Sequence, residues 1–95
     1  MRSPQALGKV IAEALNHYGL ATKARNYEVL THWAEIVGDQ VALATHAEKL
    51  DRGVLTVKVT NSVWRYELTL RSKEILKKIA SACGDDIVKE IRWKL

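Results

Sequence analysis

The sequence predicts one two-layer α+β domain over residues 1–95, with helices on one face of a three-stranded sheet. Three observations predict it. Apolar residues recur at helical spacing through residues 1–44, a strand–turn–strand pattern surrounds Arg52-Gly53, and period-two alternation returns at the C-terminal end. The expected order of elements is α-α-β-β-α(α)-β.

Residues 1–44 are expected to be helical. Ser3-Pro4 is a typical helix start and predicts a helix over about residues 4–18. A second helix is expected from Thr22 or Lys23 to Val37, and a short helical turn over Asp39 to Ala44. The inward face of the second helix is expected to carry Ala24, Tyr27, Leu30, Trp33, Ala34 and Val37.

The second part, residues 45–95, begins with a β-hairpin. Strands are predicted over about Thr45 to Leu50 and Val54 to Thr60, because apolar and polar residues alternate in the second of them. Arg52-Gly53 supplies the turn, since glycine tolerates a positive φ without steric cost.

A helical region follows the hairpin and is predicted to break once. Asn61 and Ser62 offer side-chain oxygens as caps. The apolar residues before and after Arg71-Ser72 fall on opposite arcs of a continuous helix, so two helices are expected, over about 62–70 and 72–83.

The chain closes with a predicted strand. Ile87, Ile91, Trp93 and Leu95 lie at strand-like spacing after the helix-ending Gly84-Asp85. Because this strand arrives from a helix, a crossover can place it parallel to a hairpin strand.

Net charge points to a polyanion as partner. The formal charge is +4 at neutral pH, and all of it lies in residues 44–95, with eleven Lys and Arg against seven Asp and Glu. The hairpin, the helical region and the last strand are expected to gather these cations on one surface. The candidate nucleic-acid-binding residues are Lys49, Arg52, Lys58, Arg65, Arg71, Lys73, Lys77, Lys78, Arg92 and Lys94.

The three tryptophans have two kinds of expected place. Trp33 and Trp93 lie on predicted inward faces and are interpreted as core residues. Trp64 follows the polar cap at the junction of strand and helix. It either covers the end of the core or projects to contact a base or a protein partner.

The sequence contains no motif that is typical of a catalytic or metal-binding site. His17, His32 and His46 fall in three different elements, without ligands at metal-binding spacing, and no glycine-rich phosphate loop occurs. Cys83 lies on the apolar arc of its helix and is interpreted as a small buried hydrophobe. The sequence therefore predicts a non-enzyme with no cofactor and no metal. A single cysteine and the lack of a signal peptide or long apolar run predict a soluble, cytoplasmic protein.

Two sequence blocks resemble the DciA-like family of bacterial proteins. The first is Trp33-Ala34-Glu35-Ile36-Val37-Gly38, and the second is Asn61-Ser62-Val63-Trp64 followed by Glu67-Leu68. Between them lie Val41-Ala42, Thr45-His46, Leu50 and Gly53-Val54-Leu55-Thr56-Val57, and the resemblance extends to Ile91-Arg92-Trp93.

This resemblance implies a KH-like fold of type II order. It also implies a non-enzymatic, DNA-binding role in bacterial DNA replication, in which family members recruit or load the DnaB-type replicative helicase. The Gly-x-x-Gly phosphate loop of nucleic-acid-binding KH domains has no counterpart at Leu70-Arg71-Ser72-Lys73, so Arg71 and Lys73 are expected to contact phosphates by charge.

Two alternatives stay open at this point. One is a KH-like module that binds RNA. The other is a protein-interaction domain that binds no nucleic acid and presents its basic face to an acidic partner surface.

Overall fold

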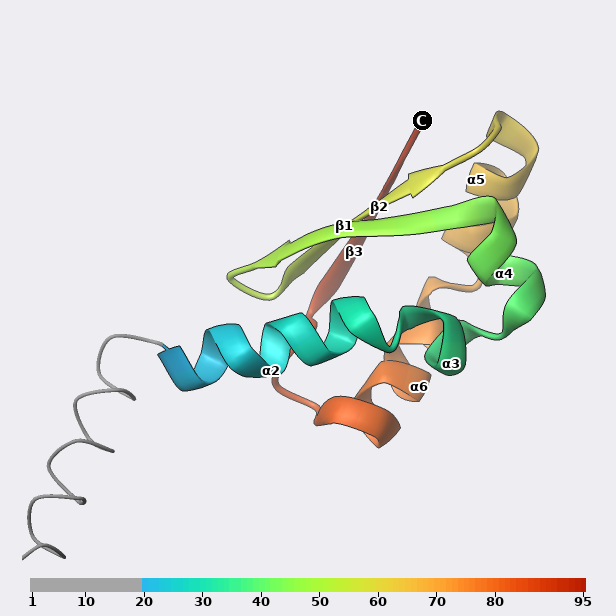
Figure 1. Ribbon diagram of the computed structural model, residues 1–95. Helices are drawn as coiled ribbons and strands as arrows, with labels where there is room; N and C mark the ends of the chain where they lie inside the picture. Colours follow the sequence, from blue (N-terminus) through green and yellow to red (C-terminus); the bar gives the residue numbers. More distant parts are fainter. Residues whose placement is uncertain (1–19) are drawn as a thin grey trace, which may run out of the picture.

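The computed structural model describes residues 20–95, and the helix expected over residues 4–18 lies outside them (Figure 1). The described residues form a three-stranded sheet with helices packed on one face. In chain order the elements are α2 Leu20–Thr31, α3 Trp33–Val37, α4 Asp39–Ala44, β1 Thr45–Asp51, β2 Val54–Val59, α5 Ser62–Leu70, α6 Ser72–Cys83 and β3 Glu90–Lys94. The α+β prediction is confirmed, and this order fits the KH-like fold that the resemblance implied.

The sheet has the order β1-β2-β3, so β2 is its central strand. β1 pairs with β2 antiparallel through the predicted turn, where Arg52 has a φ of 51° and Gly53 a φ of 81°. Two successive positive φ values are typical of the type I′ hairpin turn. β3 pairs with β2 in parallel, as predicted for a strand that arrives by a crossover.

The core lies between the sheet and the helices. Leu55 and Val57 of the central strand are fully buried, and their register partners on β1 and β3 face the same way. They pack with Leu68 of α5 and with Ile75 and Ile79 of α6. The helices therefore cover the face of the sheet on which Leu55 and Val57 lie.

The predicted break between two helices occurs where the sequence placed it. The Asn61 side chain accepts a hydrogen bond of 2.9 Å from the backbone N–H of Trp64, which caps the start of α5. Arg71 separates α5 from α6, and Gly84 ends α6. The position of the break is confirmed, but the expected inward arc of α5 is wrong. α5 buries Leu68, while Val63, Tyr66 and Leu70 are exposed.

The second predicted helix is in fact two, α2 and α3, with a turn at His32. The Thr31 hydroxyl donates to the carbonyl of Tyr27, and the His32 ring bonds the carbonyl of Glu28, so side chains occupy backbone acceptors at the helix end. The prediction of one continuous helix to Val37 was wrong at His32, where these side-chain hydrogen bonds accompany a turn.

The predicted inward face of this region also needs correction. The buried residues are Val29, Trp33 and Val37, spaced four apart, while Leu30 is half-buried. Tyr27 is 67% exposed, and Ala24 and Ala34 are exposed as well. Two overlapping stripes were available at helical spacing, and packing on the sheet selected the one that contains Val29.

The final strand is shorter than predicted. Ile87 is buried in the turn that precedes β3, and Leu95 lies after the strand and is half exposed. The backbone N–H groups of Lys89 and Glu90 both donate to the carbonyl of Gly53, which joins the start of β3 to the hairpin turn. None of the helices described in residues 20–95 is both long and apolar enough to cross a bilayer.

Candidate nucleic-acid interface

The sheet face opposite the helices, called the open face below, carries charged side chains in rows. No element within residues 20–95 covers it (Figure 1). Because cross-strand partners point to the same side of a sheet, the register defines three rows. They are His46–Lys58–Lys94, Lys49–Thr56–Arg92 and Asp51–Val54–Glu90. Four of the ten predicted binding residues, Lys49, Lys58, Arg92 and Lys94, therefore lie on the open face.

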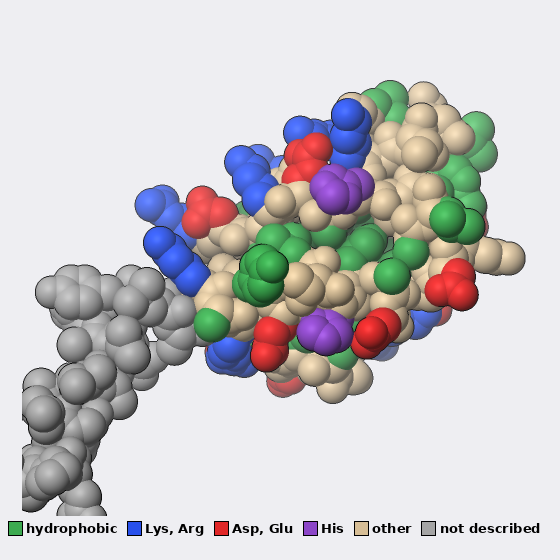
Figure 2. Space-filling model, viewed as in Figure 1, with side chains coloured by type: hydrophobic (Ala, Val, Ile, Leu, Met, Phe, Trp, Pro, Cys, Tyr) green, Lys and Arg blue, Asp and Glu red, His purple; other side chains and the backbone are tan. Residues whose placement is uncertain are grey.

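Figure 2 shows Lys and Arg side chains gathered at the hairpin end of the molecule, with Asp and Glu among them. Two of the open-face cations are paired with acids: Lys94 Nζ lies 2.8 Å from a Glu48 carboxylate oxygen, and Arg92 Nε lies 3.8 Å from Glu90. The ammonium of Lys94 holds the pKa of Glu48 below its ordinary value, and Lys58 and His46 lower it further. This face is therefore cationic with internal counter-charges.

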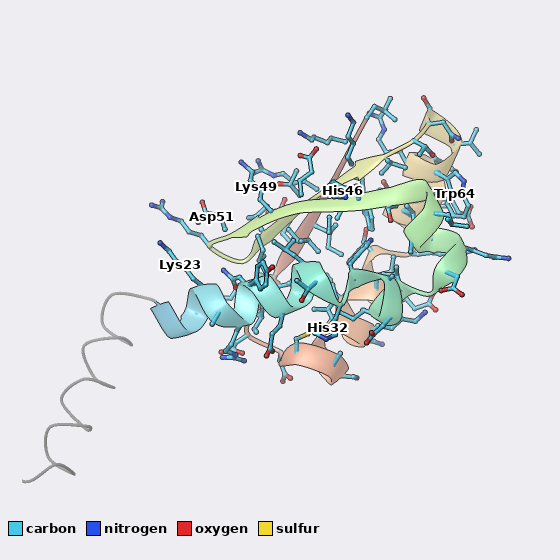
Figure 3. The ribbon with its side chains drawn as sticks, in the orientation of Figure 1. Lys23, His32, His46, Lys49, Asp51 and Trp64 are labelled. Carbon is cyan, nitrogen blue, oxygen red and sulfur yellow. The ribbon has the colours of Figure 1, made fainter. Side chains whose placement is uncertain are left out.

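A shallow hollow of about 250 Å³ lies on the open face near the hairpin tip. Figure 3 shows Lys49 and Asp51 extending from β1 toward this side. Its lining residues are Lys49, Asp51, Arg52, Val54, Thr56 and Arg92. Arg52 of the turn thus joins two open-face cations around one depression large enough for a phosphate group.

Two cations that the sequence did not single out also approach Arg52. A second hollow, of about 330 Å³, is bounded by Arg25 of α2, Arg52 and Lys89. Arg25 Nη2 donates to the carbonyl of Cys83 and to the Asp86 carboxylate, at 3.3 and 3.2 Å. Arg25 belongs to the electrically neutral half of the sequence, so only the packing of α2 beside the hairpin could reveal it.

The remaining predicted cations lie on the helical layer. Ile75 and Ile79 turn α6 toward the sheet, which leaves its lysines on the side away from the sheet. Arg71 pairs with Glu67 at 2.9 Å, and Lys78 lies 4.0 Å from Glu74. The helix cations are Arg65, Arg71, Lys73, Lys77 and Lys78. The structure therefore divides the predicted basic surface into an open-face group and a helix group.

Trp64 lies at the opposite end of the sheet from the hairpin turn (Figure 3). It is half-buried and packs against the core, and it also lines a hollow of about 500 Å³ together with Leu43 of α4. The two uses foreseen for this indole are thus not exclusive: one side contacts the core while another faces a surface depression.

Exposed apolar side chains also occur on α4 and α5. Leu43 is 86% exposed, and Val63, Tyr66 and Leu70 of α5 are each about two-thirds or more exposed. At spacings of three and four residues the last three share one face of α5. We call Leu43, Val63, Trp64, Tyr66 and Leu70 the apolar end. Grouped exposed apolar residues of this kind mark interaction surfaces.

Comparison with known families identifies the chain. A family model described as "Dna[CI] antecedent, DciA" matches residues 6–93. The chain belongs to the DciA family. The resemblance noted in the sequence is confirmed, and the matched range includes both the open face and the apolar end.

Curated proteins of similar sequence occur in Mycobacterium and Rhodococcus. The UPF0232 protein of Mycobacterium tuberculosis (strain H37Rv) is 33% identical over 92 residues, which cover 97% of this chain and 49% of the relative. The UPF0232 protein of Rhodococcus jostii (strain RHA1) is 32% identical over 91 residues, covering 96% and 48% of the two chains. The chain therefore spans about half the length of the curated relatives it matches.

Cys83 of this DciA-family chain is half-buried at the end of α6. Burial raises the pKa of its thiol, Glu28 raises it further, and Arg25 opposes the shift. Within residues 20–95, no three His, Cys, Asp or Glu side chains are grouped to hold a metal ion.

Proposed function

We propose that this chain is a non-enzymatic DNA-binding adaptor that recruits or loads a DnaB-type replicative helicase in bacterial DNA replication. Membership of the DciA family supports the helicase role. The observation that carries the DNA-binding part is the set of four cations in two neighbouring rows of the open face, Lys49, Lys58, Arg92 and Lys94.

DNA binding would be electrostatic and largely independent of sequence. Lys and Arg on the open face would contact phosphates, and the three rows contain no Trp, Tyr or Phe on which a base could stack. Since each phosphate contact releases counterions, four contacts predict a log–log dependence of affinity on salt with a slope of roughly −3.

Helicase binding would use the apolar end. Trp64 beside Leu43 offers a depression, and α5 also exposes the apolar side chains of Tyr66 and Leu70. Aromatic residues in partly desolvated pockets commonly dominate the energy of protein interfaces. DNA would then contact the open face, and the helicase would contact the end of the sheet at which Trp64 lies.

The DNA-binding proposal is tested by fluorescence anisotropy with single-stranded DNA, duplex DNA and single-stranded RNA at 50 and 200 mM salt. The open-face variant replaces Lys49, Lys58, Arg92 and Lys94 with Gln. The matched helix variant replaces Arg71, Lys73, Lys77 and Lys78 with Gln and removes the same charge. We expect the open-face variant to lose DNA binding and the helix variant to retain most of it.

Each other outcome has a definite meaning. Loss only in the helix variant would move the DNA site to α6, and affinity that does not change with salt would contradict the electrostatic basis. Preference for RNA over both DNA forms would favour a KH-like RNA-binding module instead.

The exposed apolar end also favours a second candidate, a protein-interaction domain that binds no nucleic acid. Capture of purified DnaB-type helicase by the immobilised chain tests the helicase contact in both readings. Trp64→Ala and Tyr66→Ser should abolish capture. Tyr27→Ser is the matched control, because Tyr27 is as exposed as Tyr66, at 67% against 69%, but lies on α2. Equal loss in all three variants would contradict a site at the apolar end.

A further inference from the structure

One ion pair on the open face joins the two edge strands of the sheet. Glu48 belongs to β1 and Lys94 to β3, yet their charged atoms lie 2.8 Å apart, with β2 between the two strands. The two side chains therefore cross the central strand from opposite edges. An ion pair with this reach occupies the middle of the face that the proposed function assigns to DNA.

Glu48 reaches this place because β1 contains a bulge. Ala47 pairs with Val57 and Lys49 pairs with the adjacent Thr56, so Glu48 is the extra residue. Bulges commonly re-aim a side chain or interrupt a ladder. Here the bulge adds an acidic group to the open face beside Lys49, while Ala47 keeps its inward position.

The surroundings of the Glu48 carboxylate are those of an anion site. His46, Lys58 and Lys94 form one row across all three strands. All three lower the pKa of Glu48, with Lys94 contributing most. Similar charges directly opposite one another in a sheet are unfavourable, so an anion nearby stabilises a row with two lysines.

We propose that the row His46–Lys58–Lys94 is a phosphate-binding site that the Glu48 carboxylate occupies until a nucleic-acid phosphate displaces it. A phosphate can accept hydrogen bonds from both ammonium groups and from the His46 ring on its several oxygens. As a nucleic-acid site this inference rests on the proposed function. The inference adds that Glu48 competes with phosphate for this row and so limits the affinity for nucleic acid.

The exchange predicts a specific pattern among variants. Glu48→Gln frees Lys94 and should tighten binding of single-stranded DNA by roughly fivefold at 50 mM salt, the upper range for one exposed ion pair. The salt slope should steepen by about 0.7, because one more cation is available to a phosphate. Lys94→Gln should weaken binding less than twofold in the natural chain and roughly fivefold in the Glu48→Gln background.

Glu90→Gln is the matched control. It removes the same charge from the same face, but Glu90 pairs with Arg92 of its own strand, at 3.8 Å. We expect less than a twofold change. Equal effects of Glu48→Gln and Glu90→Gln, or a Lys94→Gln effect that does not depend on Glu48, would overturn the proposal.

A titration with tripolyphosphate separates this inference from the proposed function. Backbone amide resonances of His46, Lys58 and Lys94 should shift to saturation in the natural chain, and at a lower tripolyphosphate concentration in Glu48→Gln. Saturable shifts with no binding of DNA or RNA would support the anion site and overturn the proposed function. DNA binding without any shift at the row would overturn the anion site and leave the proposed function standing.

Discussion

Trp93 Nε1 donates a hydrogen bond of 2.9 Å to Ser72 Oγ, which joins the last strand to the break between α5 and α6. The same hydroxyl donates to the carbonyl of Leu68, at 3.2 Å, near the end of α5. The Trp93 ring also packs against that of Trp33, with centroids 6.2 Å apart. One indole thus connects β3 to the helix break and to α3.

Replacing Ser72 with Ala should destabilise the fold by about 1–2 kcal/mol, because the partly buried indole N–H would lose its acceptor. Urea unfolding followed by tryptophan fluorescence measures this. In the Trp93→Phe background, residue 93 has no side-chain N–H to donate. There, Ser72→Ala should lower the free energy of unfolding much less. Equal costs in both backgrounds would contradict an energetic role for this hydrogen bond.

Arg52→Asn should stabilise the chain by about 1 kcal/mol. Arg52 has a φ of 51°, a conformation that costs most residues energy and that asparagine adopts readily. Thermal unfolding checks the gain. Arg52→Lys keeps the charge and should leave stability unchanged.

Gly53→Ala, at the adjacent position, should destabilise the chain. Its φ is 81°, and an added Cβ would lie 3.4 Å from Lys89 Cγ. We expect a loss of about 1 kcal/mol. Stabilisation by this change, or destabilisation by Arg52→Asn, would contradict the type I′ assignment.

Cys83 should react slowly with thiol reagents at pH 8. Burial raises its pKa, so the neutral thiol predominates and the reactive thiolate is scarce. The rate with 5,5′-dithiobis(2-nitrobenzoate) as a function of pH measures this. Glu28→Gln should speed the reaction, since Glu28 raises the pKa. A rate equal to that of a free thiol would show that the side chain is not shielded.

Glu48 should titrate below the ordinary pKa of a glutamate, because Lys94, Lys58 and His46 favour its charged form. With the folded-state pKa below the unfolded one, its stabilising contribution is present above the unfolded value. That contribution disappears as the pH falls through the folded value. A carboxyl-detected NMR titration measures the pKa directly. Lys94→Gln should raise it, and an unchanged value would contradict the ion pair across the sheet.

Several elements could be predicted because their causes are local. Arg52-Gly53 forms the turn and Asn61 caps α5, each through the preferences of a few adjacent residues. The helix break at Arg71 followed from a change in the phase of apolar residues along one helical region. The parallel strand followed from chain direction. The inward stripe of α2 was predicted incorrectly, because Tyr27 and Val29 both fit helical spacing and only contact with the sheet distinguishes them.

The amino-acid sequence by itself determined the order of helices and strands, the ends of most of them and the family, since these depend on short-range patterns along the chain. Only the tertiary structure decided which charges share a surface. It placed four cations on the open face, left the α6 lysines on the helical layer, and brought Glu48 across β2 to Lys94. Such neighbours are set by strand register, by a bulge and by the packing of layers, which join residues far apart in the chain.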